Sequence, residues 1–314
     1  MFGMRTSRFL LLCLIAMPVF AELNDPIEAM MNLWKYDNPK QSAVRFISLI
    51  DSAEASSDKD YLPALLPQIA RSYAMRGDFK SAHEQLNELE LLIQDRSSRG
   101  QIFYLLERGR ALKAGGDKKR ARILFNDAFI IADRLGDDYL AIDAAHMMAI
   151  TETLPNQHKW HVIAVNIAEA STSEFARNWL GTLYNNMAWT YFEKGRYEKA
   201  LELFKQVVQF RKEKEQLRRA QIARWAVGRT LRELNRLPQA LTIQEKLFDE
   251  RTSIGQEADG LVVEEIAEIY HLLGRSEAKS YFAQAYRLLV LDPGLVQNEP
   301  ARLKRLKDLS MSED

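Results

Sequence analysis

The sequence predicts an all-α fold, a solenoid of about seven stacked helix–turn–helix units closed by a C-terminal capping helix. Three observations predict it: apolar residues recur at helical spacing, alanines recur roughly every 38 to 40 residues, and glycine or asparagine recurs at the same interval. A single hairpin cannot bury its own apolar face, so the repetition indicates that neighbouring hairpins cover one another. At two helices per unit, we expect about 14 to 16 helices.

The clearest unit lies at residues 188–204, which read AWTYFEKGRYEKALELF. Ala188 and Ala200 are small at positions where two helix backbones would pass close together, and Phe204 would fill the space around that crossing. Gly195 separates the two helical patterns, because glycine readily adopts the left-handed conformation that ends a helix. The segment therefore predicts two short amphipathic helices folded back on each other.

Two columns of residues repeat this unit along the chain. The alanine column contains Ala43, Ala82, Ala121, His161, Ala200, Ala240 and Ala278. The turn column contains Asn38, Gly77, Gly116, Asn156, Gly195, Asn235 and Gly274. Because glycine and asparagine best tolerate the left-handed conformation, we expect each turn-column residue to adopt it at the end of a helix. His161 takes the place of alanine and marks a degenerate unit.

The spacing of the clearest unit resembles the tetratricopeptide repeat, a helix–turn–helix unit of roughly 34 residues. The residues that carry the resemblance are Ala188, Tyr191, Gly195, Tyr197, Ala200 and Phe204. The resemblance implies a repeat array at residues 22–297, with units near 24–62, 63–101, 102–141, 142–180, 181–220, 221–259 and 260–293. Residues 298–314 are expected to form the capping helix and a tail that is disordered from Ser310 onward.

The first 21 residues have the pattern of a signal peptide. Arg5 and Arg8 precede a twelve-residue apolar run, and Val19 and Ala21 are the small residues that a signal peptidase reads. We expect cleavage after Ala21, export, and no stable membrane insertion afterwards, since a spanning helix needs about 20 apolar residues. In a Gram-negative bacterium the compartment would be the periplasm. An uncleaved membrane anchor is the alternative.

Composition and motifs argue against several classes of protein. The 43 basic and 43 acidic residues balance, so no basic excess favours nucleic acid as a partner. No glycine-rich phosphate loop, HExxH or GxSxG motif is present, and the single cysteine, Cys13, lies in the leader. His158 and His161 are three residues apart, but the pattern supplies no third metal ligand. The sequence therefore predicts a non-catalytic protein without a cofactor or a metal.

The resemblance also implies a binding face, because the first helix of each hairpin lines the concave side in this family. Residues off the packing columns of two adjacent first helices are Asn185, Asn186, Trp189 and Phe192, then Ile222, Trp225, Arg229 and Arg232. Tryptophan and arginine are enriched at binding hot spots, and asparagine can both donate to and accept from a peptide backbone. We predict a peptide-binding site at Asn185, Asn186, Trp189, Trp225, Arg229 and Arg232. Alternatively, the two tryptophans pack against each other or against the adjacent helix.

The charge pattern near this face has two interpretations. Residues 211–236 carry nine Lys or Arg against three Glu, and residues 257–277 carry six acidic residues against one Arg. The first segment could dock an acidic partner. The favoured interpretation is that its arginines pair with the next unit, with Arg229 and Arg232 contacting the carboxylates of Glu264, Glu265 and Glu268.

These features predict a non-catalytic, exported scaffold or adaptor that binds another protein or an extended peptide on the concave face of its solenoid. Two alternatives remain open. One is a sensory or regulatory module that acts through a membrane signalling partner. The other is a carrier of a small molecule or glycan, with Trp189 and Trp225 as stacking platforms.

Overall fold

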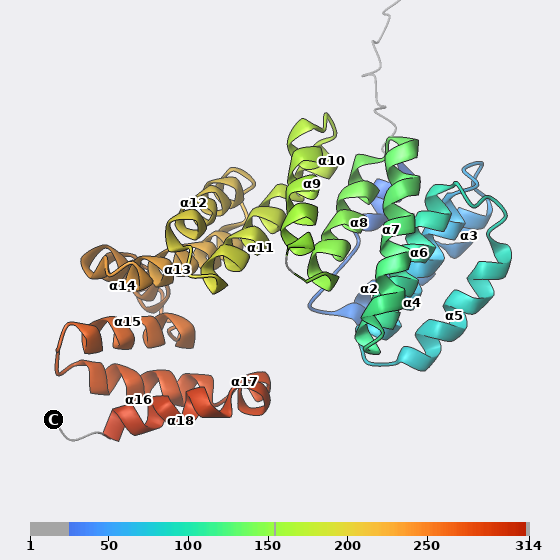
Figure 1. Ribbon diagram of the computed structural model, residues 1–314. Helices are drawn as coiled ribbons and strands as arrows, with labels where there is room; N and C mark the ends of the chain where they lie inside the picture. Colours follow the sequence, from blue (N-terminus) through green and yellow to red (C-terminus); the bar gives the residue numbers. More distant parts are fainter. Residues whose placement is uncertain (1–24, 154, 312–314) are drawn as a thin grey trace, which may run out of the picture. The chain divides into compact units, whose positions relative to one another are not determined.

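The computed structural model describes residues 25–153 and 155–311, and within them it contains helices and no strand (Figure 1). The chain divides into two compact units, one ending at Leu92 and the other starting at Ile93. The all-α prediction is therefore confirmed. The helix labels in the described residues reach α18, above the expected 14 to 16, because the chain inserts four helices of four to six residues, α1, α3, α10 and α17.

The described part of the first unit covers residues 25–92. Its helices are α1 (Pro26–Met31), α2 (Pro39–Ile47), α3 (Ile50–Glu54), α4 (Tyr61–Ala74) and α5 (Phe79–Leu92). Helix α4 packs against α5 and against α1, α2 and α3. Trp34, in the segment between α1 and α2, is buried against Phe46 and donates from its Nε1 to Gln68 Oε1 at 3.1 Å. Thus an indole and a buried amide of α4 satisfy each other inside this unit.

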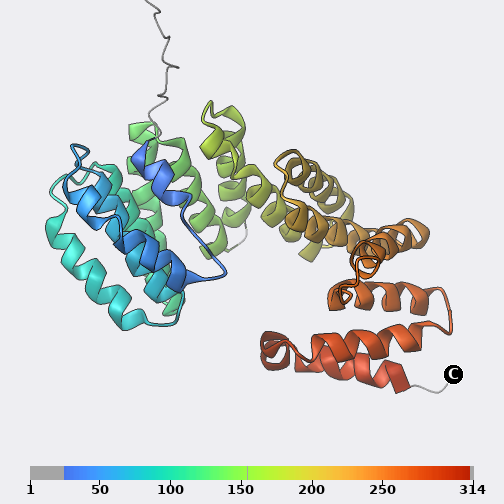
Figure 2. The same ribbon diagram turned by 180° about the vertical axis from the view of Figure 1, so that it is seen from behind.

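The second unit begins at residue 93, and its described part ends at residue 311. Its helices are α6 (Arg99–Ala114), α7 (Lys118–Leu135), α8 (Asp138–Thr151), α9 (Asn156–Ala170), α10 (Glu174–Arg177), α11 (Leu180–Glu193), α12 (Tyr197–Glu213), α13 (Leu217–Glu233), α14 (Leu237–Thr252), α15 (Gly260–Leu272), α16 (Ala278–Leu289), α17 (Pro293–Asn298) and α18 (Pro300–Met311). Each long helix packs against the next along the chain, and α18 packs against α16 (Figures 1 and 2). This order is that of stacked helical hairpins.

The turn column behaves as predicted at five of its seven positions. The φ angle is +68° at Gly195 and +56° at Asn235, and Gly77, Gly116 and Gly274 are also left-handed. The two other asparagines differ. Asn38 has φ of −139° and caps the start of α2 with its side chain, and Asn156 is the first residue of α9. Asparagine side chains also favour helix starts, so the residue type alone did not distinguish a helix end from a helix beginning.

The alanine column marks close helix crossings. All seven of its members are buried, the six alanines and also His161, which has 1% of its surface exposed. Gly109 and Gly228 each lie twelve residues before an alanine of this column. A Cβ added to Gly109 would lie 2.4 Å from the side chain of Phe125, and one added to Gly228 would lie 2.4 Å from that of Gln244. The glycines at these two positions thus make room for a side chain of the facing helix.

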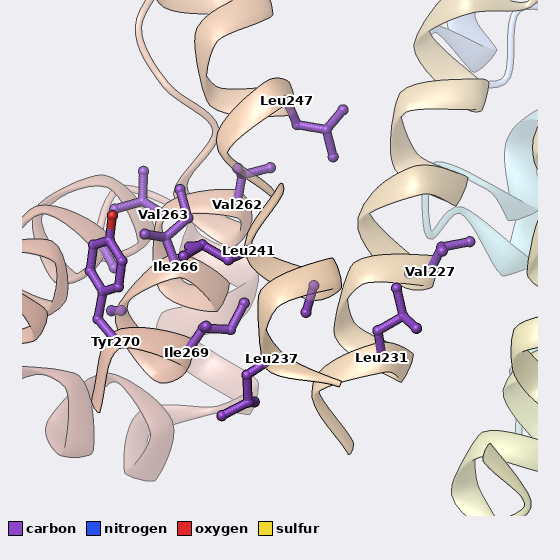
Figure 3. Close-up of a cluster of buried hydrophobic side chains, with 14 of the residues drawn as sticks. Val227, Leu231, Leu237, Leu241, Leu247, Val262, Val263, Ile266, Ile269 and Tyr270 are labelled. Carbon is purple, nitrogen blue, oxygen red and sulfur yellow. The ribbon is translucent and has the colours of Figure 1, made fainter. Parts of the chain in front are cut away.

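A hydrophobic core runs from α11 to α18. Figure 3 shows part of it, with side chains of α13, α14 and α15 such as Leu231, Leu241 and Ile266 drawn as sticks. Leu303 and Leu306 of α18 belong to the same cluster and are buried. The C-terminal helix therefore covers apolar surface of α16. Ser310 and Met311 belong to this helix, which corrects the expectation that disorder begins at Ser310.

The signal-peptide prediction for residues 1–21 lies outside the described residues, and so does the end of the expected tail, at residues 312–314. In the part of the chain that the structure does describe, none of the helices combines the length and the apolar character needed to cross a membrane.

Candidate functional site

Trp189 and Trp225 lie together, as the sequence predicted for first helices of adjacent hairpins. Trp189 is on α11 and Trp225 on α13, and their ring centroids are 6.1 Å apart. Each is partly buried against the core that runs from α11 to α18. Trp189 also meets Phe204 edge to face, with centroids 4.9 Å apart. The alternative that the two tryptophans pack against each other is therefore confirmed. Their role in peptide binding stays a prediction.

A pocket of about 170 Å³ opens beside Trp225. Its lining comes from three successive helices and the segment before α15: Arg218, Gln221, Ile222, Trp225, Leu247, Arg251, Asp259, Leu261 and Val262. The indole Nε1 donates to the carbonyl oxygen of Leu261 at 3.1 Å, which fixes the ring as one wall. Leu247 and Val262 project from α14 and α15 (Figure 3). Ile222, 51% exposed, forms the rim. The pocket, which we call the Trp225 pocket, is therefore mainly apolar with charged residues at its edge.

A second pocket, of about 160 Å³, lies on the other side of Ile222. It is lined by Gly181, Thr182, Asn185, Val207, Arg211, Arg219, Ile222 and Ala223, from α11, α12 and α13. We call it the Arg211 pocket. Of the predicted site residues, Asn185 lies in it and Trp225 lines the neighbouring pocket. Ile222 separates the two.

Arg211 is a functional candidate that the sequence did not single out. It lies in the last turn of α12 and is only 6% exposed. Its Nη1 donates to Gln216 Oε1 at 2.5 Å and its Nη2 to Thr182 Oγ1 at 3.3 Å, so both partners are neutral. Burial, together with the positive charge of Arg219, lowers the pKa of the Arg211 guanidinium to about 10. The basic stretch 211–236 contained this signal but did not show which arginine lacks a carboxylate.

Asn186 is the other predicted amide on α11. Its side chain is half-buried, and Asn185 Nδ2 approaches its Oδ1 at 3.4 Å. The backbone oxygen of Asn186 accepts from Thr190 Oγ1 at 3.0 Å within the helix. The structure thus places Asn185 at the Arg211 pocket and Asn186 beside it.

Arg229 and Arg232 are engaged by the next hairpin. Arg232 Nε donates to Glu265 Oε2 at 2.7 Å, and Arg229 Nη1 lies 3.3 Å from Glu265 Oε1. Burial raises the pKa of the Glu265 carboxyl, and the two arginines oppose this effect. Glu264 and Glu268 instead pair with Arg302 and Arg305 of α18. The favoured pairing interpretation is therefore right for Glu265 and wrong for Glu264 and Glu268.

The histidines of α8 and α9 are not arranged as a metal centre. Among the described residues, no three His, Cys, Asp or Glu side chains cluster as metal ligands. His158 packs edge to face on Tyr191, with centroids 5.7 Å apart. Burial, together with smaller effects of His158 and Lys194, lowers the pKa of His161 to about 4. His161 is thus a neutral residue of the core at neutral pH.

Comparison with known proteins supports the repeat assignment. Residues 180–214, which span α11 and α12, match the family model described as a tetratricopeptide repeat. No curated protein matches the chain.

Two solved structures share the fold. A signal transduction ATPase with numerous domains, which has a tetratricopeptide repeat sensor and comes from Pyrococcus horikoshii, aligns with a TM-score of 0.67 at 16% identity. That alignment covers 90% of this chain and 43% of the ATPase, so the chain spans less than half of the larger protein's length. NprR, solved in complex with its cognate peptide NprX, aligns with a TM-score of 0.54 at 14% identity, over 95% of this chain and 87% of NprR.

Proposed function

We propose that this chain, which has the fold of tetratricopeptide-repeat proteins and one such repeat at residues 180–214, is a non-catalytic scaffold that binds an extended peptide segment of another protein. The Trp225 pocket carries the proposal. It joins an anchored indole to an exposed isoleucine and is bordered by Arg218, Arg251 and Asp259. An apolar pocket with a polar rim is the arrangement in which an inserted side chain contributes most to affinity.

The size of the pocket favours a peptide over a free small molecule. About 170 Å³ is below the roughly 300–1,000 Å³ of sites that enclose a drug-sized ligand. Such a volume suits a single apolar side chain presented by an extended backbone, with Asn185 and Asn186 of α11 available to contact that backbone. The glycan-carrier alternative needs an open stacking platform. Trp189, packed against Phe204 and Trp225, is a poor one.

The fold of NprR, a protein solved with its cognate peptide, supports this proposal only at the level of architecture. A sensory module acting through a membrane partner would use the same binding face and differ in what the bound peptide triggers.

Export is part of the proposal and rests on residues 1–21, where Arg5 and Arg8 precede an apolar run that ends in small residues. The mature protein is expected to start at Glu22. Mass spectrometry of the protein recovered from the exported fraction tests this, and a chain that retains Met1 in the membrane fraction would overturn it.

The binding test uses Ile222→Ser rather than the tryptophans alone. Trp189→Ala and Trp225→Ala remove aromatic rings from the core, so each is expected to lower stability by roughly 3–5 kcal/mol as well as to weaken binding. Ile222 is half exposed, so its replacement keeps the fold. If the peptide buries Ile222, the substitution is expected to reduce the binding free energy by about 1.5–3 kcal/mol, which is tenfold or more in affinity.

A random peptide library displayed on phage is selected on the wild-type protein, and an enriched peptide is synthesised and titrated against the variants. Leu217→Ser is the matched control, because Leu217 is exposed on the same helix and lines neither pocket. We expect Ile222→Ser to lose affinity and Leu217→Ser to retain it, with unchanged melting temperatures. Failure to enrich any peptide, or equal binding by Ile222→Ser, would contradict the proposal.

A further inference from the structure

The Arg211 guanidinium is a buried charge with no counter-charge. In the part of the chain that the structure describes, its partners are the neutral oxygens of Gln216 and Thr182, and no carboxylate lies at ion-pair distance. Arginine cannot escape this situation by losing its proton near neutral pH. A buried unpaired ion is costly even after relaxation. Stability of the fold therefore does not explain why Arg211 is buried without a carboxylate.

The neighbours of Arg211 increase its electrostatic cost. Arg219 lines the same pocket, is exposed, and forms no ion pair among the described residues. Like charges facing one pocket repel. The end of α12 contributes only a partial negative charge, and such helix-end effects are small and fall off within a turn. The protein therefore does not neutralise this pocket by its own groups.

The backbone makes room for the guanidinium at this place. A Cβ added to Gly181 would lie 2.6 Å from Arg211 Cζ, so only glycine allows the side chain to reach the pocket at this depth. Thr182, which accepts from Arg211, and Asn185 lie on the same face of α11 and line the same pocket. Two cations, a hydroxyl and an amide thus surround about 160 Å³ of open space.

We infer that the Arg211 pocket binds a carboxylate of the peptide ligand, with Arg211 and Arg219 as its charge partners and Thr182 and Asn185 as neutral hydrogen-bonding groups. This inference rests on the proposed peptide-binding function and specifies its ligand. Guanidinium groups pair with carboxylates through short, charge-assisted hydrogen bonds. The volume fits one acidic side chain or a chain terminus.

The position of Ile222 links this inference to the Trp225 pocket. Ile222 lines both pockets, so a single extended peptide can occupy them with two nearby residues. The expected ligand is a peptide that carries one apolar and one acidic group close together in sequence. Asp259 pairs with Arg218 at 3.0 Å on the rim of the Trp225 pocket. Its negative charge makes the Trp225 pocket less favourable than the Arg211 pocket for the acidic group of the peptide.

The test uses peptides enriched by phage selection on the wild-type protein, each synthesised in four forms. The acidic side chain is present or replaced by its amide, and the C-terminus is free or amidated, so that the two sources of carboxylate are separated. The protein variants are Arg211→Met and Arg219→Gln. Lys212→Gln is the control, because Lys212 is an exposed cation in the same helix turn and does not line the pocket.

We expect removal of the bound carboxylate, or either arginine substitution, to weaken binding about tenfold or more, as for a charge-assisted hydrogen bond. Lys212→Gln is expected to bind as the wild type does. Without peptide, Arg211→Met is expected to melt at or above the wild-type temperature, since it removes an unpaired buried charge. A structural role for Arg211 would instead lower the melting temperature.

The outcomes separate the two proposals. Enriched peptides that lack a carboxylate, or that bind Arg211→Met and Arg219→Gln normally, overturn the carboxylate site and leave peptide binding intact. Absence of any enriched peptide overturns both. Inorganic phosphate or an RNA oligonucleotide that binds through Arg211, with no acidic peptide doing so, also overturns the carboxylate assignment.

Discussion

The two ends of helix α13 present arginines in opposite electrostatic settings. Near its end, Arg232 and Arg229 converge on Glu265, which is 1% exposed. Near its beginning, Arg219 shares a pocket with Arg211 of the preceding helix α12, and no carboxylate of the described residues lines that pocket. Of these two pairs of arginines, only Arg229 and Arg232 have a carboxylate partner among the described residues, Glu265. Arg229 and Arg232 thus make a packing contact with their counter-charge, whereas Arg211 and Arg219 lack one in the described part of the chain, and this difference is the basis of the inferred carboxylate site.

Removing a buried charge has opposite effects on stability depending on whether the charge has a partner. Removing one partner of a buried ion pair leaves the other charge desolvated and unpaired, which is strongly destabilising. Removing a charge that already lacks a partner relieves the same cost. Neutralising substitutions at Glu265 and at Arg211 are therefore expected to change stability in opposite directions.

The largest effect is expected from Glu265→Gln. It leaves Arg232 and Arg229 without a carboxylate and is expected to lower the free energy of unfolding by about 3 kcal/mol, at the low end of the range for a broken buried pair. Urea unfolding measures the change. Arg211→Met is expected to show no such loss, and an equal loss in both variants would show that Arg211 has a counter-charge as Arg232 does.

An exposed pair serves as the control for Glu265→Gln. Arg236 and Glu198 lie 2.6 Å apart with side chains 44% and 62% exposed. Glu198→Gln is expected to change the unfolding free energy by no more than about 1 kcal/mol, since solvent screens such pairs. A larger change in Glu198→Gln would show that the loss of stability does not depend on burial of the ion pair.

The next effect concerns His161, a buried group that can avoid an unpaired charge by staying neutral. Its pKa is lowered to about 4, mainly by burial, against about 6.5 in the unfolded chain. A depressed pKa stabilises the fold above about pH 6.5, and this contribution is lost as the pH falls toward 4. The loss can reach about 3 kcal/mol.

Thermal melting between pH 7 and pH 4 measures this dependence, with His161→Ala as the variant because most other units have alanine at that position. We expect a shallower decrease for His161→Ala than for the wild type. The pKa of His146 is also lowered to about 4, so part of the slope should persist. If the melting temperatures of the two proteins fell equally with pH, protonation of His161 would not destabilise the fold.

The smallest effect on stability is expected from giving Arg211 a counter-charge. Thr182→Asp would place a carboxylate where Thr182 Oγ1 now accepts from Arg211 Nη2. The substitution is in the first turn of α11, where an acidic residue is favourable. We expect about 1.5 kcal/mol of added stability from the new charged hydrogen bond and loss of acidic-peptide binding. Thr182→Asn is the uncharged control, and equal stability of the two variants would argue against an unpaired Arg211.

The repeat architecture was predictable because its causes are local. Small residues such as Ala188 and Ala200 are needed wherever helix backbones cross, and Gly195 is needed where the chain turns with positive φ, so both recur in the sequence at fixed intervals. Asn156 was misassigned because asparagine serves helix starts as well as helix ends. The adjacency of Trp189 and Trp225 followed from the repeat register alone.

The hairpins, their turns and the helix faces that meet follow from the sequence alone, since these depend on neighbours in the chain and on a regular period. Which charges pair depends instead on how the helices pack. Glu264 and Glu265 are adjacent, but successive helical residues point about 100° apart, so one contacts Arg302 and the other Arg232. Arg211 remains unpaired for the same reason: its counter-charge would have to come from another helix at the right rotation, and the side chains that reach it there, Thr182 and Gln216, are neutral.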